Sequence, residues 1–188
     1  TSWDVARFEV CAHRYVAVHE RTFGVAILAD GPRGYDVRGD ELKLTLLRAP
    51  HFPDPRADIG QQHLEWSVML TAGDPLLHGV EEESARIAHP LRVVDGTPVL
   101  SPLDIDLRVH GALISAVKPA DDESGDLIVR VWETLGSRTL GTLQVGGAID
   151  AELCNGLEAS DDVSLDVTDG VMDVELRPFE IQTIRIKR

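Results

Sequence analysis

Apolar side chains recur at every second residue in many short stretches of this chain of 188 residues, and turn sequences separate the stretches. From 6 to 20, for example, Val10, Ala12, Val16 and Val18 share one parity, and polar side chains fill most of the other. Such alternation places one face of a β-strand against a core and the other in water. We therefore predict a half-buried strand over 6–20 and an all-β class for the chain.

Further strands are predicted wherever a short apolar run lies between turn sequences. These runs cover residues 23–29, 42–47, 63–70, 107–117, 127–134, 139–145 and 148–154. The dipeptide Asp169-Gly170, which suits a tight turn, predicts a hairpin between 163–167 and 172–176. A final run, 179–186, shifts its apolar parity near Thr183, which indicates either a β-bulge or a strand buried on both faces.

One helix is predicted, over 78–89. The stretch has a helix-compatible pattern and ends before Pro90, and three acidic residues, Glu81, Glu82 and Glu83, lie near its start. Negative charge in the first turn interacts favourably with the helix dipole.

The division of the chain is predicted from its proline and turn residues. Residues 91–106 contain Pro98 and Pro102 and are typical of a connection between compact units. Many short strands with one short helix favour an antiparallel β-sandwich over a parallel sheet. We expect 1–90 to be part of a large β-sandwich that ends in the helix, and 107–188 to form a smaller terminal β-sandwich domain.

Charge and cysteine content limit the classes of partner. The formal net charge of −14 would repel phosphate groups, so neither nucleic acid nor an anionic membrane is expected as a partner. No apolar run approaches the roughly 20 residues of a membrane span, and no leader for export is expected. Cys11 and Cys154 belong to no metal-binding spacing, and two buried reduced thiols are favoured over a disulfide. These features predict a cytoplasmic protein.

No metal site is expected in this chain. Its seven histidines include no HxH, HxxxH or HExxH arrangement. His13 and His19 share a strand face, but six residues of extended chain would separate them by roughly 20 Å, too far to share one ion.

The proline-rich loop around Asp54, Arg56 and Asp58 offers two interpretations. Oxygen ligands at alternating loop positions suit a small ion or a sugar hydroxyl. The simpler interpretation is a structural loop in which aspartate side chains bond to the backbone.

Two other features have a structural and a functional interpretation. Trp66 and Trp132 offer surfaces for stacking on a sugar, but each lies inside an apolar strand and is more simply part of a core. The acidic run 121–125 is typical of a solvated hairpin tip.

The amino-acid sequence of several stretches resembles that of the C-terminal half of glycoside hydrolase family 38, the retaining, metal-dependent α-mannosidases. The first stretch begins with Trp3-Asp4-Val5-Ala6-Arg7-Phe8-Glu9-Val10, and the most specific follows at Phe23-Gly24-Val25-Ala26-Ile27-Leu28, Gly34-Tyr35-Asp36-Val37, Leu44-Thr45-Leu46-Leu47-Arg48-Ala49-Pro50 and Pro53-Asp54-Pro55. The tail adds Leu127-Ile128-Val129-Arg130-Val131-Trp132-Glu133 and Arg177-Pro178-Phe179-Glu180-Ile181. In the family, these pieces read as a strand, a Gly-Tyr turn, a Leu-Leu-Arg strand and a Pro-Asp-Pro loop, and then the terminal strands.

The resemblance implies that catalysis resides elsewhere. Family 38 enzymes bind zinc and carry an aspartate nucleophile in an N-terminal catalytic domain, so this chain is expected to hold no catalytic residue, no metal and no cofactor of its own. Its expected partners are the catalytic domain of the same polypeptide and, in the intact enzyme, the α-mannoside substrate. A homo-oligomer is also expected, because strands that precede Trp3 in the family would leave apolar surface uncovered.

The resemblance also places loops of the large β-domain near the mouth of the active site. It therefore favours Arg48, Asp54, Arg56 and Asp58 as a substrate-proximal loop. The leading expectation for function is a non-catalytic scaffold for the catalytic domain of a retaining α-mannosidase. The alternative is an independent carbohydrate-binding β-sandwich module.

Overall fold

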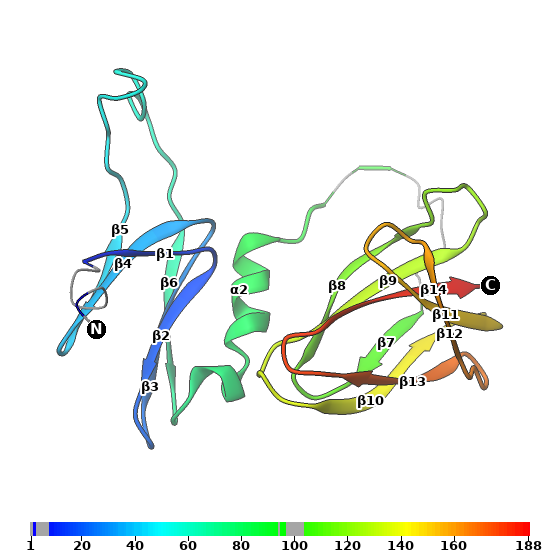
Figure 1. Cartoon of the computed structure of the whole chain (residues 1–188). Coiled ribbons are helices and arrows are strands. Elements are labelled where there is room, and N and C mark those ends of the chain that lie inside the picture. The colour runs from blue at the N-terminus through cyan, green and yellow to red at the C-terminus, as the bar shows by residue number, and fades with distance from the viewer. Residues whose placement is uncertain (1, 3–7, 94, 97–103) are drawn as a thin grey trace. The chain divides into compact units, whose positions relative to one another are not determined.

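The computed structural model describes residues 2, 8–93, 95–96 and 104–188. The chain divides into two compact units, Thr1–Val94 and Asp95–Arg188 (Figure 1). All strand pairs in the described part are antiparallel, and one α-helix accompanies them, so the predicted all-β antiparallel class is confirmed. The Trp3–Arg7 part of the resemblance and half of the predicted connection 91–106, namely 94 and 97–103, lie outside the described residues.

The first unit contains a three-stranded sheet with a helix on one face. The sheet has the order β2 (Tyr15–His19), β3 (Gly24–Ala29), β6 (Trp66–Thr71), and a 3₁₀ helix, η1 (Pro75–His78), leads into α2 (Val80–Ala88). The helix lies where the acidic stretch predicted it. Ala26 and Leu28 of the central strand are buried with Val80 of the helix and form a small core.

A polar contact fixes α2 to the sheet. The Tyr15 hydroxyl donates a hydrogen bond to Glu81 Oε1 at 2.8 Å, and Arg14 Nη1 donates to Glu81 Oε2 at 3.4 Å. Burial and the nearby Glu81 carboxylate raise the pKa of Tyr15 well above its usual value, so it remains a neutral donor. Glu81 therefore acts both in the first helical turn and as an anchor to β2.

A second sheet of the first unit corrects two sequence predictions. Its order is β1 (Val10–Ala12), β4 (Arg33–Arg38), β5 (Glu41–Thr45). The strand predicted over 6–20 is instead two strands in different sheets, because the backbone bends at His13 and Arg14 and side-chain parity continues through the bend. The Gly34-Tyr35 pair, expected in a turn, lies inside β4.

The face of the β2-β3-β6 sheet opposite α2 is apolar and open. Cross-strand pairs place its side chains in rows, which we call the apolar face; its members are Val16, Val18, Val25, Ile27, Trp66, Val68 and Leu70. Trp66 is 49% exposed, Val68 53% and Leu70 66%. The expectation that Trp66 packs in a core is therefore wrong for this structure: the strand alternates as predicted, but its apolar side faces outward.

The second unit is a β-sandwich, as predicted. Its smaller sheet has the order β13-β10-β7 and its larger sheet the order β12-β11-β14-β9-β8. The strands are β7 (Ile105–Arg108), β8 (Ala112–Pro119), β9 (Leu127–Glu133), β10 (Thr139–Val145), β11 (Asp150–Cys154), β12 (Ser160–Leu165), β13 (Val171–Leu176) and β14 (Ile181–Lys187). Fully buried side chains from both sheets, including Leu143, Leu176, Val131 and Ile184, fill the space between them.

For this unit, the sequence predicts two features whose strand pairing differs in the structure. The strand predicted over 107–117 is two strands in different sheets, separated by a turn in which Gly111 has a left-handed φ of 75°. The Asp169-Gly170 turn exists, but β12 pairs with β11 and β13 pairs with β10, so the turn carries the chain from one sheet to the other. Turn chemistry specifies a reversal of the chain without specifying which strands pair.

The final strand resolves the two alternatives left by its parity. β14 pairs with β11 and with β9 in unbroken register, which excludes a bulge within it. Thr183 is 4% exposed and its neighbour Ile184 is 0% exposed, so the middle of the strand is buried on both faces. The apolar side chains of the other parity, Phe179 and Ile181, are 68% and 62% exposed, so burial accounts for the parity of Ile184 and Ile186 but not for theirs.

A buried carboxylate joins two connections of the sandwich. Glu133, the last residue of β9, is 0% exposed, and its oxygens accept hydrogen bonds from the backbone N–H groups of Leu135, Gly136 and Phe179, each at 2.8 Å. Burial alone would raise its pKa, but these backbone donors outweigh burial and the pKa is lowered. The charged carboxylate thus fixes both the segment after β9 and the one before β14.

We predict that Glu133→Gln destabilises the second unit by about 3 kcal/mol, because an amide cannot accept from every donor and leaves buried N–H groups unsatisfied. Urea unfolding followed by the NMR signals of this unit measures the change. Glu175→Gln is the matched control, since the Glu175 side chain is 57% exposed, and we expect less than about 0.5 kcal/mol from it. Equal effects of the two substitutions would contradict the role assigned to Glu133.

The same carboxylate predicts a pH dependence. Because its pKa is lower in the folded than in the unfolded state, its contribution is complete above the unfolded value of about 4.5 and is lost as pH falls through the folded value. The difference in unfolding free energy between the wild type and Glu133→Gln should therefore be constant near pH 7 and shrink below about pH 4. A difference that grows on acidification would contradict this.

Candidate functional site

A cavity of about 470 Å³ lies in the first unit, where the end of β5 meets the proline-rich loop. We call it the loop cavity; its polar lining residues are Arg33, Thr45, Arg48, Asp58, Gln62 and His63. It brings together Arg48 and Asp58 of the predicted substrate-proximal loop. Asp54 and Arg56 are outside its lining.

The two aspartates of the loop bond to backbone groups. Asp54 Oδ1 accepts a hydrogen bond from the Arg56 N–H at 2.9 Å, which is an Asx-turn. Asp58 Oδ2 accepts from the Ala49 N–H at 3.1 Å and so ties the return of the loop to its start. Ala49 and Asp58 both have left-handed backbone angles, with φ of 47° and 62°. These bonds support the structural interpretation for Asp54, whereas Asp58 combines it with a place in the cavity.

Arg48 lies at the base of the loop beside one acidic neighbour, Glu9. Its Nη1 lies 3.8 Å from Glu9 Oε2, and Thr45 donates a short hydrogen bond to the same carboxylate. The Arg48 side chain is nevertheless 76% exposed. Because a guanidinium has five N–H donors, this geometry leaves several of them facing solvent at the cavity.

The loop cavity suits binding better than bond cleavage. Arg48, Gln62 and His63 supply donors, and Asp58 is the one carboxylate among the described residues of its lining. A retaining glycosidase uses two carboxyl groups about 5 Å apart. The lining therefore contains half of such a pair, in a carboxylate already bonded to the Ala49 N–H.

Gln62 and His63 were not singled out by sequence reasoning. They follow the loop and precede β6, and their polarity was the available signal. Their approach to Arg48 depends on how the loop turns back, which spacing alone does not predict.

Three other properties bear on chemistry. In the part of the chain that the structure describes, no group of three or more His, Cys, Asp or Glu could hold a metal ion. Both cysteines are free; Cys154 is buried as expected, but Cys11 is exposed. No helix among the described residues has the length and apolarity needed to cross a membrane.

Comparison with protein families gives two matches in chain order. Residues 1–56 match the glycosyl hydrolases family 38 C-terminal domain, and residues 111–184 match the glycosyl hydrolases family 38 C-terminal beta sandwich domain. The second match lies within the β-sandwich unit described above.

Known proteins similar to the chain are much longer than it is. Alpha-mannosidase 2C1 of Homo sapiens is 32% identical over 191 residues, which cover 98% of this chain and 18% of that protein. An alpha-mannosidase of Saccharomyces cerevisiae is 26% identical over 217 residues, covering 99% of this chain and 19% of that protein. The crystal structure of an alpha-mannosidase from Enterococcus faecalis V583 has a similar fold, with a TM-score of 0.69 and 22% identity over 95% of this chain and 21% of that one.

The hydrogen bonds of the loop generate a reciprocal prediction. Asp58→Ala should speed hydrogen exchange of the Ala49 amide about fivefold to tenfold and leave the Arg56 amide unchanged, because it removes one acceptor worth about 1 kcal/mol. Asp54→Ala should do the reverse. Amide exchange followed by NMR measures both, and identical effects of the two variants would show that the loop does not hold these separate contacts.

Proposed function

This chain belongs to the C-terminal region of glycosyl hydrolase family 38, and we propose that it is a non-catalytic β-sandwich portion of a longer retaining α-mannosidase. In this proposal the intact protein hydrolyses α-mannosides, and the chain supports its catalytic domain and the rim of its active site. The names of the similar proteins, all α-mannosidases, support the activity. We assign 1–90 to the C-terminal part of the large β-sandwich domain of family 38, 91–106 to a connection and 107–188 to the terminal β-sandwich domain.

The observation that carries the scaffold role is the apolar face. Its rows run across all three strands: Val18 pairs with Val25 and Val25 with Leu70, and Val16, Ile27 and Val68 form the next row. Apolar surface in water costs about 25 cal/mol per Å², and contiguous apolar patches usually mark an interface. Because the chain spans 18% of the length of its human relative, we propose that another part of the same polypeptide covers this face.

Substitutions on the apolar face test the scaffold role. Val68→Ser with Leu70→Ser should destabilise the longer α-mannosidase by about 2–4 kcal/mol, because the proposed contact buries both side chains. In the chain alone, the same pair should lower self-association, since it removes apolar surface from solvent. Thermal unfolding and light scattering measure the two effects.

Leu140→Ser is the matched control, because Leu140 is 69% exposed and lies in the other unit. It should be close to neutral in the longer protein. A longer protein that tolerates the double substitution as well as it tolerates Leu140→Ser would refute the scaffold proposal.

The substrate-proximal role of Arg48, Asp54, Arg56 and Asp58 forms the second part of the proposal. Arg48 and Asp58 present a donor and an acceptor at the loop cavity, which suits sugar hydroxyl groups. Asp54 and Arg56 shape the loop through their mutual contact. Zinc, which the resemblance implies for the family, does not fit the described residues, so we assign it to the catalytic domain of the longer protein.

A kinetic measurement tests the loop. Arg48→Ala in the longer enzyme should raise KM for an α-mannoside roughly tenfold with a smaller change in kcat, because it removes a binding contact without touching the reacting atoms. Arg86→Ala is the control: that side chain is 72% exposed on α2, outside the loop cavity. The chain alone should release no product from an aryl α-mannoside. An unchanged KM for Arg48→Ala would refute the substrate-proximal assignment.

A cytoplasmic location completes the proposal. It is supported by the two free thiols, since exported proteins commonly oxidise such pairs, and by the strong negative charge, which disfavours anionic membranes.

A further inference from the structure

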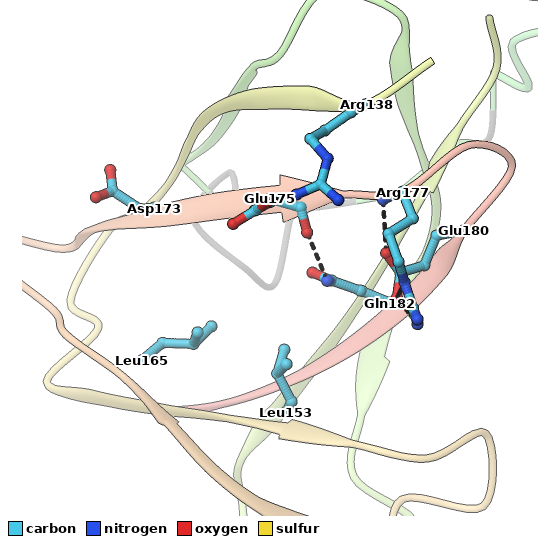
Figure 2. Close-up of a pocket in the computed structure, with 8 residues that line it drawn as sticks. All are labelled: Arg138, Leu153, Leu165, Asp173, Glu175, Arg177, Glu180 and Gln182. Atoms are coloured by element: carbon cyan, nitrogen blue, oxygen red, sulfur yellow. Dashed lines mark hydrogen bonds and ion pairs between the residues drawn. The ribbon is translucent and has the colours of Figure 1, made fainter. Parts of the chain in front are cut away.

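The sandwich of the second unit is open along one side. Leu153 of β11 and Leu165 of β12 pack only partly against the core, and Val163, which pairs with Leu153, is 46% exposed. Next to them runs β13, the edge strand of the smaller sheet. A groove of about 350 Å³ lies between these strands, and Figure 2 shows its two leucines on one side and its polar side chains on the other.

The polar side of the groove consists of donors and acceptors that are hydrogen-bonded to one another. Arg138 Nη1 donates to Glu175 Oε1 at 2.7 Å, and Arg177 Nη2 donates to Glu180 Oε1 at 2.7 Å (Figure 2). Gln182 Nε2 donates to the Glu175 carbonyl oxygen at 2.7 Å. Each guanidinium keeps further N–H donors and each carboxylate keeps further lone pairs, so the groove presents fixed donor–acceptor pairs.

This arrangement selects for a neutral ligand with many hydroxyl groups. Three carboxylates, including Asp173, outnumber the two guanidinium groups in the lining and repel an anion, while the guanidinium groups offset most of the attraction for a cation. A hydroxyl group both donates and accepts, which matches a neighbouring guanidinium and carboxylate. The apolar floor of Leu153 and Leu165 suits the C–H face of a sugar ring, and the volume lies within the usual range of about 300–1,000 Å³ for small-ligand sites.

A second cavity continues the groove. It measures about 360 Å³ and shares Leu153, Arg177, Glu180 and Gln182 with the first. It adds Asn155, Asp161 and Thr183 to the polar lining. Two adjoining cavities with common walls fit consecutive units of one chain better than a single small molecule.

We propose that this groove binds consecutive hexose units of a neutral mannoside chain at a site separate from the loop cavity. The identity of the sugar rests on the proposed function, whereas the preference for a neutral polyhydroxyl ligand rests on the groove itself. Because the groove is open, each sugar unit keeps contact with water and binding is weak, with a dissociation constant on the order of 1–10 mM. The site would retain a branched or long substrate near the enzyme without taking part in hydrolysis.

Addition of a peptide strand at the edge of β13 is the less favoured use of this surface. Gln182 already donates to the Glu175 carbonyl group of that strand, and two acidic side chains, Asp173 and Glu175, lie on it. Charged residues on an edge strand oppose pairing with another chain.

NMR titration of the chain with an α-linked mannobiose tests the proposal. Amide shifts should move for residues lining the groove, around 153, 165 and 173–182, and saturate in the millimolar range. Arg138→Ala should weaken binding at least fivefold, because it removes one guanidinium and frees Glu175. Mannose 6-phosphate should bind less tightly than mannose, since the groove contains more carboxylates than guanidinium groups.

Arg108→Ala is the matched control. Arg108 is 70% exposed and paired with Asp106, and Arg138 is 68% exposed and paired with Glu175, but Arg108 lies outside the groove. Equal binding by both variants, shifts confined to other surfaces, or no saturable shift up to 100 mM mannobiose would each overturn the proposal. None of these results would change the outcome of the apolar-face test, so failure of the sugar site and failure of the scaffold role are distinguishable.

Discussion

The larger sheet of the second unit depends on the fully buried, charged carboxylate of Glu133. Glu133 accepts backbone hydrogen bonds from the segment that follows its own strand and from Phe179, which lies 46 residues further on. Burying a carboxylate is costly, and the charged form persists here because several N–H groups converge on it. Since β9 and β14 are neighbours within the larger sheet, this one side chain aligns the strands on which the rest of the sandwich is assembled.

The sequence predicted individual strands better than their pairing. Alternation located the central strands, and the acidic first turn located α2, because burial and the helix dipole act on neighbouring residues. Pairing failed at the bend of His13 and Arg14, at Gly111 and at Asp169-Gly170, where the chain passes between sheets. Parity survives such a bend, and a turn residue fixes only the local angle, so neither signal identifies the partner strand.

For the candidate sites too, local sequence predicted individual residues, whereas contacts between segments distant in sequence were not predicted. The resemblance and the polar loop brought Arg48 and Asp58 forward, and both line one cavity. The place of His63 in the loop cavity and the groove beside Gln182 could not be predicted from the sequence. Both arise only where segments distant in sequence meet. Trp66 illustrates the converse: its alternation resembles that of a core strand, yet its side chain lies half exposed on the apolar face.

The central position of β14 also has a consequence for synthesis on the ribosome. This strand comprises Ile181–Lys187 and supplies the hydrogen-bonding partner of both β9 and β11. As translation proceeds from the N-terminus, the earlier strands of the larger sheet emerge with a gap between them that nothing else fills. The nascent sheet therefore stays divided until β14 leaves the exit tunnel, and during that interval its unpaired strand edges are open to pairing with other chains.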